Sequence, residues 1–65
     1  MSKVIRGLLE TIIREDETLN RQYAELSKYL DNPQLGQKFA EYQKHGQVRI
    51  GELHGMWRIM ENSKP

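Results

Sequence analysis

The dipeptide Asn32-Pro33 lies at the midpoint of this 65-residue chain and divides it into two stretches of similar length. Asparagine is a favoured N-cap residue, and proline is favoured at the first position of a helix. Proline also disfavours helical backbone at the residue before it, so an earlier helix must end before Asn32. We therefore expect two helices, over about residues 3–31 and 33–61, joined by a very short turn and followed by a frayed tail over 62–65.

Each stretch carries a series of residues at alternating spacings of three and four, which is the spacing of a helix packed against another helix. The series in the first stretch comprises Ile5, Leu9, Ile12, Asp16, Leu19, Tyr23, Leu26 and Leu30. The series in the second comprises Leu35, Phe39, Tyr42, Gly46, Arg49, Leu53, Met56 and Met60. These two series predict an all-α fold: an antiparallel two-helix hairpin that forms a single domain over residues 1–65.

In an antiparallel hairpin centred near Asn32-Pro33, the numbers of two facing residues add up to a constant. Pairing Leu30 with Leu35 sets that sum at 65. Every layer of the predicted seam is then apolar except in the middle, where Leu19 faces Gly46 and Asp16 faces Arg49. Charged groups inside a seam are tolerated when they form a hydrogen-bonded pair. We predict a buried polar layer of Asp16 and Arg49. The alternative is that both side chains lie at the edge of the seam and reach solvent.

The chain carries more large apolar residues than a two-helix seam can bury. Those left over in the half of the hairpin remote from the turn are Val4, Leu8, Ile13, Val48, Ile50, Trp57 and Ile59, and Tyr29 is the only one near the turn. A chain this short buries little surface, and without cysteine it has no disulfide to stabilise it. We therefore expect self-association to supply the missing stability. The pattern predicts a homodimeric four-helix bundle whose interface includes Val4, Leu8, Ile50 and Trp57.

Asp16 and Tyr23, followed by the stretch over residues 32–45, resemble one helix pair of ferritin-like, rubrerythrin-type proteins. Those helix pairs place a carboxylate seven residues before a tyrosine on one helix and a Glu-x-x-His motif on the next. The motif is missing here, since one alignment puts His45 and the other puts Gly46 at the glutamate position. What the resemblance implies is therefore architecture, a hairpin that doubles into a four-helix bundle.

The sequence contains no motif that is typical of a catalytic site or a metal-binding site. Asp16 and His45 are the candidate metal ligands, but three ligands from one chain are not evident, so we expect neither a metal nor another cofactor. The sequence has no cysteine, no glycine-rich phosphate loop after a strand, and no serine, histidine and carboxylate at triad spacing. We do not expect an enzyme.

Composition and charge leave three hypotheses about function open. The formal net charge is +1, the basic residues are interspersed with acids, and no apolar run or secretory signal is present. We therefore expect a cytoplasmic protein with no membrane or nucleic-acid partner. The first hypothesis is a non-enzymatic, oligomerising interaction or regulatory module that binds itself and another protein. The alternatives are a Rop-like RNA-binding helical dimer and a degenerate ferritin-like metal-binding half-bundle.

Overall fold

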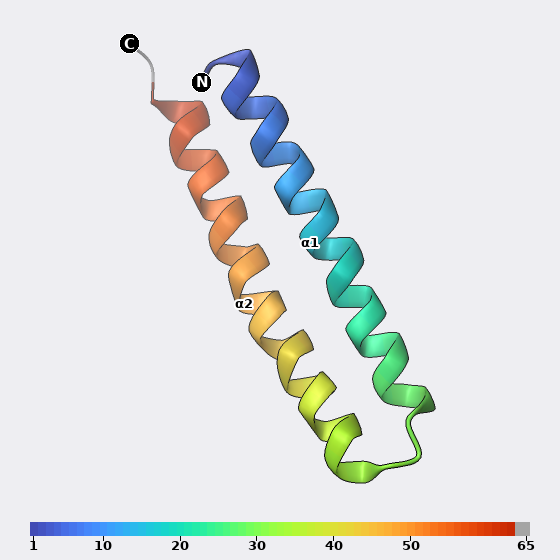
Figure 1. Cartoon of the computed structure of the whole chain (residues 1–65). Coiled ribbons are helices and arrows are strands. Elements are labelled where there is room, and N and C mark those ends of the chain that lie inside the picture. The colour runs from blue at the N-terminus through green and yellow to red at the C-terminus, as the bar shows by residue number, and fades with distance from the viewer. Residues whose placement is uncertain (64–65) are drawn as a thin grey trace.

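The computed structural model describes residues 1–63, and two helices account for nearly all of them (Figure 1). Helix α1 spans Lys3–Tyr29 and helix α2 spans Pro33–Asn62. The two run antiparallel and side by side, so that the start of α1 and the end of α2 lie at the same end of the molecule (Figure 1). The Cα atoms occupy a flat, elongated volume of 53 × 16 × 10 Å. The predicted helical hairpin is confirmed.

Polar side chains mark where both helices begin. The Ser2 hydroxyl accepts a hydrogen bond from the backbone N–H of Ile5 at 3.1 Å. The Asn32 Oδ1 atom accepts hydrogen bonds from the N–H groups of Gln34 and Leu35 at 3.0 and 3.2 Å. Both contacts satisfy backbone donors that a helix start otherwise leaves without a partner. The predicted N-cap role of Asn32 is confirmed.

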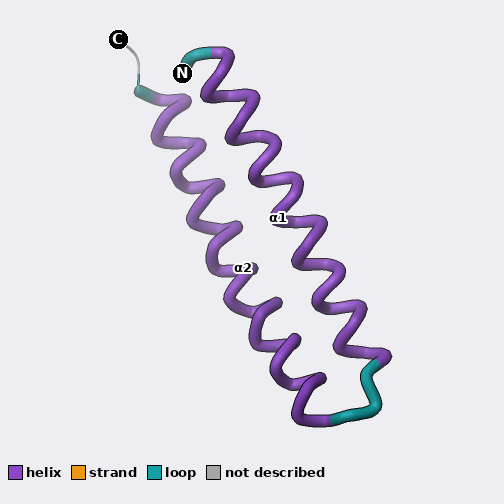
Figure 2. Tube along the Cα trace, viewed as in Figure 1, coloured by secondary structure: helices purple, strands orange, loops and turns teal. Residues whose placement is uncertain are grey.

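The turn between the helices is longer than predicted (Figure 2). Helix α1 ends at Tyr29 rather than at residue 31, because Leu30 already has extended backbone with φ −78° and ψ 126°. Asn32 is extended as well, as the residue before a proline prefers to be. Residues 30–32 therefore form the connection, which lets the chain reverse direction without distorting either helix.

The end of α2 lies one residue beyond the predicted boundary. The backbone N–H and the hydroxyl of Ser63 both donate hydrogen bonds to the carbonyl oxygen of Ile59, at 3.0 and 2.8 Å. These bonds satisfy a carbonyl of the last helical turn, so Asn62 belongs to α2 and not to the predicted frayed tail. Lys64 and Pro65, the remainder of that tail, lie outside the described residues.

Aromatic side chains hold the helices together near the turn. The rings of Tyr23 and Tyr42 face each other across the helices with centroids 5.8 Å apart, in the layer predicted for them. Phe39 completes the cluster, with its ring centroid 6.0 Å from that of Tyr23 and 5.7 Å from that of Tyr42. Centroid separations in this range are favourable for tilted and edge-to-face ring pairs.

At one layer in the middle of the hairpin, the residue of α1 that faces α2 differs from the prediction by one position. Asn20, which is only 7% exposed, packs against the buried Gly46, whereas Leu19 is 41% exposed. The predicted pairing of Leu19 with Gly46 is wrong. A helix has 3.6 residues per turn, so a seven-residue pattern drifts around it, and the residue nearest the neighbouring helix changes along its length.

The hydrophobic core is small. Among residues 1–63, only Leu9 and Ile13 are buried hydrophobic side chains, each 8% exposed. The sequence pattern predicted that Ile13 lies outside the seam. This prediction is wrong, because Ile13 belongs to the core. Many residues of the predicted seam are instead half-exposed, namely Ile5, Ile12, Leu19, Leu26, Leu35, Tyr42 and Met56. Two helices in contact cover only a narrow stripe of each other, and the apolar surface here is wider than that stripe.

Candidate interaction face and central polar layer

The half-exposed apolar residues recur at every seventh position on both helices. On α1 they are Ile5, Ile12, Leu19 and Leu26. On α2 they are Leu35, Tyr42 and Met56, and Arg49 occupies the remaining position of the series. The exposed fractions of the seven apolar residues lie between 41% and 51%. Residues seven apart lie on nearly the same side of a helix, so each series forms a continuous stripe.

The two stripes border the same groove between the helices. Ile12 and Leu19 of α1 and Arg49 of α2 line this groove, together with Glu15, Asp16 and Leu53. We call the surface formed by both stripes the heptad face; it comprises Ile5, Ile12, Leu19, Leu26, Leu35, Tyr42, Arg49 and Met56. One side of the hairpin is thus apolar along most of its length, with a charged residue near the middle.

An ion pair crosses the centre of the heptad face. The Nε and Nη2 atoms of Arg49 donate hydrogen bonds to the two carboxylate oxygens of Asp16, at 2.6 and 2.5 Å. The Asp16 side chain is 11% exposed and that of Arg49 is 52% exposed. The predicted layer is therefore half-buried, with the carboxylate inside and the guanidinium at the edge. The hydrogen bonds from Arg49 hold the pKa of Asp16 below its ordinary value.

Asn20 forms a second polar element of this layer, which the spacing of the apolar residues did not predict. Its Oδ1 atom is buried and accepts no hydrogen bond from any group in residues 1–63. Buried amide oxygens nearly always have a donor, so this atom carries a cost to the hairpin. Two features of the sequence could have identified Asn20. It lies seven residues from both Ile13 and Ser27, and it faces Gly46 if the numbers of facing residues add up to 66 instead of 65.

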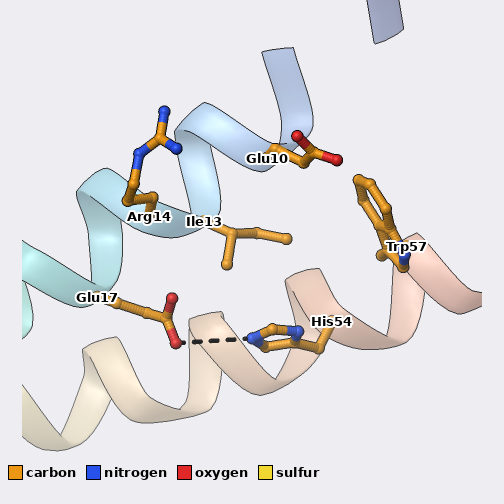
Figure 3. Close-up of a pocket in the computed structure, with 6 residues that line it drawn as sticks. All are labelled: Glu10, Ile13, Arg14, Glu17, His54 and Trp57. Carbon is orange, nitrogen blue, oxygen red and sulfur yellow. Dashed lines mark ion pairs between the residues drawn. The ribbon is translucent and has the colours of Figure 1, made fainter. Parts of the chain in front are cut away.

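The opposite side of the hairpin carries a groove of mixed charge (Figure 3). The residues that line it are Glu10, Ile13, Arg14, Glu17, His54 and Trp57. The Nε2 atom of His54 lies 3.8 Å from a carboxylate oxygen of Glu17, which links the two helices (Figure 3). Ile13 lies between the helices in this view, and the Arg14 side chain extends away from them. We call this surface the charged groove.

The four residues predicted to form an interface differ in their exposure to solvent. Val4 and Leu8 are 71% and 61% exposed. Ile50 and Trp57 are half-buried, and Trp57 lines a groove together with residues of α1. The expectation that exposed apolar surface gathers in the terminal half is wrong, because the heptad face continues to Leu26 beside the turn.

Trp57 is held by contacts within the hairpin. The guanidinium carbon of Arg6 lies 5.7 Å from the centre of the indole ring, which places the cation over the ring. Arg6 also donates to the carboxylate of Glu61 at 2.9 Å. These contacts join the first turns of α1 to the last turns of α2, and they were not evident from the spacing of the apolar residues.

The candidate metal ligands do not form a recognisable site. The Asp16 carboxylate is occupied by Arg49, and His45 is exposed on α2. Within residues 1–63, no group of three or more histidine, cysteine, aspartate and glutamate side chains is placed to hold a metal ion. In the same part of the chain, no helix is long and apolar enough to cross a membrane.

Compared with models of protein families, with curated proteins and with solved structures, the chain shows no significant match. The resemblance to a ferritin-like helix pair therefore remains an expectation. The heptad face, the polar layer and the charged groove are the candidate functional surfaces of the hairpin.

Proposed function

We propose that this protein is a non-enzymatic, dimer-forming helical module, in which a second copy covers the heptad face and completes a four-helix bundle. The observation that carries the proposal is the strict seven-residue spacing of half-exposed apolar residues on the same side of both helices. Such stripes bury well against other helices but not against an irregular surface. Scattered exposed apolar residues would not favour a helical partner in this way.

The energetics favour a second copy. A core of two buried hydrophobic side chains is small for an independent domain, and short chains without disulfides usually gain stability by association. The hairpin is flat and elongated, with Cα extents of 53 × 16 × 10 Å, so its broad side offers a long surface to a second copy. Covering the heptad face would bury the remaining half of seven large side chains.

The charged groove would stay on the outside of such a dimer and is the surface we propose for a further protein partner. Glu10, Arg14 and Glu17 present charges of both signs there, beside the ring of Trp57. Aromatic and arginine side chains are common anchors of protein interfaces. An RNA-binding face needs clustered basic residues, which this groove does not offer. The cysteine-free composition suits a cytoplasmic module.

The oligomeric state tests the proposal. Sedimentation equilibrium of the full chain should give twice the mass of one chain. Leu19→Glu and Ile12→Glu, each placing a charge on the heptad face, should shift the mass to that of a monomer. Val48→Glu is the matched control, because Val48 is 61% exposed but lies one residue, or about 100°, away from the heptad face.

Circular dichroism of each variant distinguishes loss of association from loss of folding. A wild-type monomer at micromolar concentration would refute the proposed dimer regardless of the variants. A wild-type dimer that Leu19→Glu and Ile12→Glu leave intact would show that another surface mediates association.

A further inference from the structure

The Asp16–Arg49 pair divides the heptad face into two apolar halves. Asp16 is the middle residue of α1, and Arg49 lies close to the middle of α2. A two-fold symmetric dimer in which the two heptad faces overlap along their full length therefore places the charged layer of one copy against the charged layer of the other. If the dimer of the proposed function forms, these charges must meet, and their arrangement depends on how the two hairpins are oriented.

Two orientations keep all neighbouring helices antiparallel. In the first, the two-fold axis runs along the helices, both turns lie at the same end, and α1 packs on the partner's α2. In the second, the axis crosses the helices within the interface, the turns lie at opposite ends, and α1 packs on the partner's α1. The apolar stripes fit both orientations, because each stripe is apolar on either side of the charged layer.

The charged residues are compatible with only one of these two orientations. With the turns together, each Asp16 lies beside its own Arg49 and beside the partner's Arg49, so the signs alternate around the layer. With the turns apart, Asp16 meets the partner's Asp16 and Arg49 meets the partner's Arg49. Glu15 lines the same groove as Asp16, so this second orientation gathers four carboxylates on one side of the bundle. Like charges in a partly desolvated layer repel strongly.

Arg49 also has hydrogen-bonding capacity left over. Its Nε and Nη2 atoms bind Asp16, while half of the side chain remains exposed on the heptad face. A guanidinium group carries five N–H donors, so several remain for acceptors beyond Asp16. With the turns together, these donors lie against the acidic pair of residues 15 and 16 in the other copy.

We infer that the two copies pack with their turns at the same end, and that a ring of alternating charges formed by Glu15, Asp16 and Arg49 of both copies sets this orientation. The inference rests on the proposed function, since it requires a second copy on the heptad face. It assigns the central layer a role in specifying the orientation of the dimer, for which a single polar layer in a helical bundle is well suited.

A spin-label experiment tests the orientation directly, because the chain has no cysteine and single cysteines can be introduced for labelling. Gln34→Cys places a label at the turn and Ser2→Cys places one at the open end. With the turns together, double electron–electron resonance should give a distance of about 20 Å at both sites, a few helix diameters. With the turns apart, both distances should approach the 53 Å length of the hairpin.

Gln47→Cys is the matched control, because a label near the middle of the hairpin gives a short distance in either orientation. A dimer with short distances at residues 2, 34 and 47 supports the inference. A dimer with a short distance only at residue 47 overturns the inference and leaves the proposed function intact. A monomeric mass overturns the proposed function itself, so the two failures are distinguishable.

The role of the charges has its own test. The triple variant Glu15→Gln, Asp16→Asn, Arg49→Met removes every charge from the layer while retaining hydrogen-bonding or apolar side chains. In the Gln34→Cys background, this variant should remain a dimer but give both the short and the long distance. A single short distance in the neutral variant would show that the charges do not set the orientation.

Discussion

Asn20 and Gly46 face each other across the helices so closely that no side-chain carbon fits between them. A Cβ atom at position 46 would lie 2.8 Å from Cγ of Asn20 and would overlap its Oδ1 atom. Real Cβ atoms essentially never approach other heavy atoms this closely, and the amide is too buried to move aside without cost. This contact fixes the position of one helix relative to the other in the middle of the hairpin.

Replacing this glycine should destabilise the protein despite the higher helix propensity of alanine. We expect Gly46→Ala to lower the free energy of unfolding by about 1–3 kcal/mol, the usual cost of overpacking. Urea unfolding followed by circular dichroism measures the change. In an Asn20→Ala background, Gly46→Ala should become neutral or stabilising, because the side-chain amide that would clash with the new Cβ atom is absent. A destabilisation of equal size in both backgrounds would contradict this account.

A glycine on open surface should behave in the opposite way. Nothing lies within 4 Å of a Cβ atom built at Gly51, which is exposed in the interior of α2. Alanine has higher helix propensity than glycine, so Gly51→Ala should raise the free energy of unfolding by about 1 kcal/mol. The same urea titration serves both variants, and sedimentation should show an unchanged mass. A loss of stability or of mass would place Gly51 in a close contact.

The Asp16–Arg49 pair should make stability depend on pH in a defined direction. The pKa of Asp16 is lowered in the folded protein, chiefly by the hydrogen bonds from Arg49, so folding favours the ionised carboxylate. This stabilisation is fully present above the unfolded pKa of about 4 and is lost as the pH falls through the lower folded value. Asp16→Asn should therefore be less stable than the wild type at neutral pH.

Unfolding at a series of pH values checks the sign. The difference in urea midpoint between the wild type and Asp16→Asn should be largest at pH 5–7 and should close below about pH 4. Arg49→Met removes the other half of the pair and should show the same trend. A difference between wild type and Asp16→Asn that stays constant down to pH 2 would mean that ionisation of the carboxylate does not stabilise the fold.

Trp57 should contribute to the stability of the hairpin itself. The indole ring is half-buried beside α1 and is covered by the Arg6 guanidinium, so Trp57→Ala should lower the free energy of unfolding by about 2 kcal/mol. Tyr29→Ala is a suitable control, because Tyr29 is 73% exposed and its loss should change stability by less than about 0.5 kcal/mol. Equal effects of the two variants would contradict this placement of Trp57.

The two helices and their connection follow from local chemistry that can be recognised in the sequence. Asn32 supplies a side-chain acceptor for free N–H groups, and proline prevents the preceding helix from continuing through it. The pairing of Asp16 with Arg49 was likewise predicted, because a short turn restricts which residues can meet and two opposite charges in one layer attract. The sequence alone was thus sufficient for the hairpin, the location of its turn and the ion pair.

Only the tertiary structure decided how the helices rotate about their own axes. The apolar surface of each helix is wider than the stripe that one neighbour covers, so several rotations bury similar areas and the spacing of residues does not choose among them. The close approach at Gly46 selects Asn20, and the same rotation buries Leu9 and Ile13. That rotation leaves Ile5, Ile12 and their seven-residue repeats at the edge, and it turns a predicted core into an exposed face.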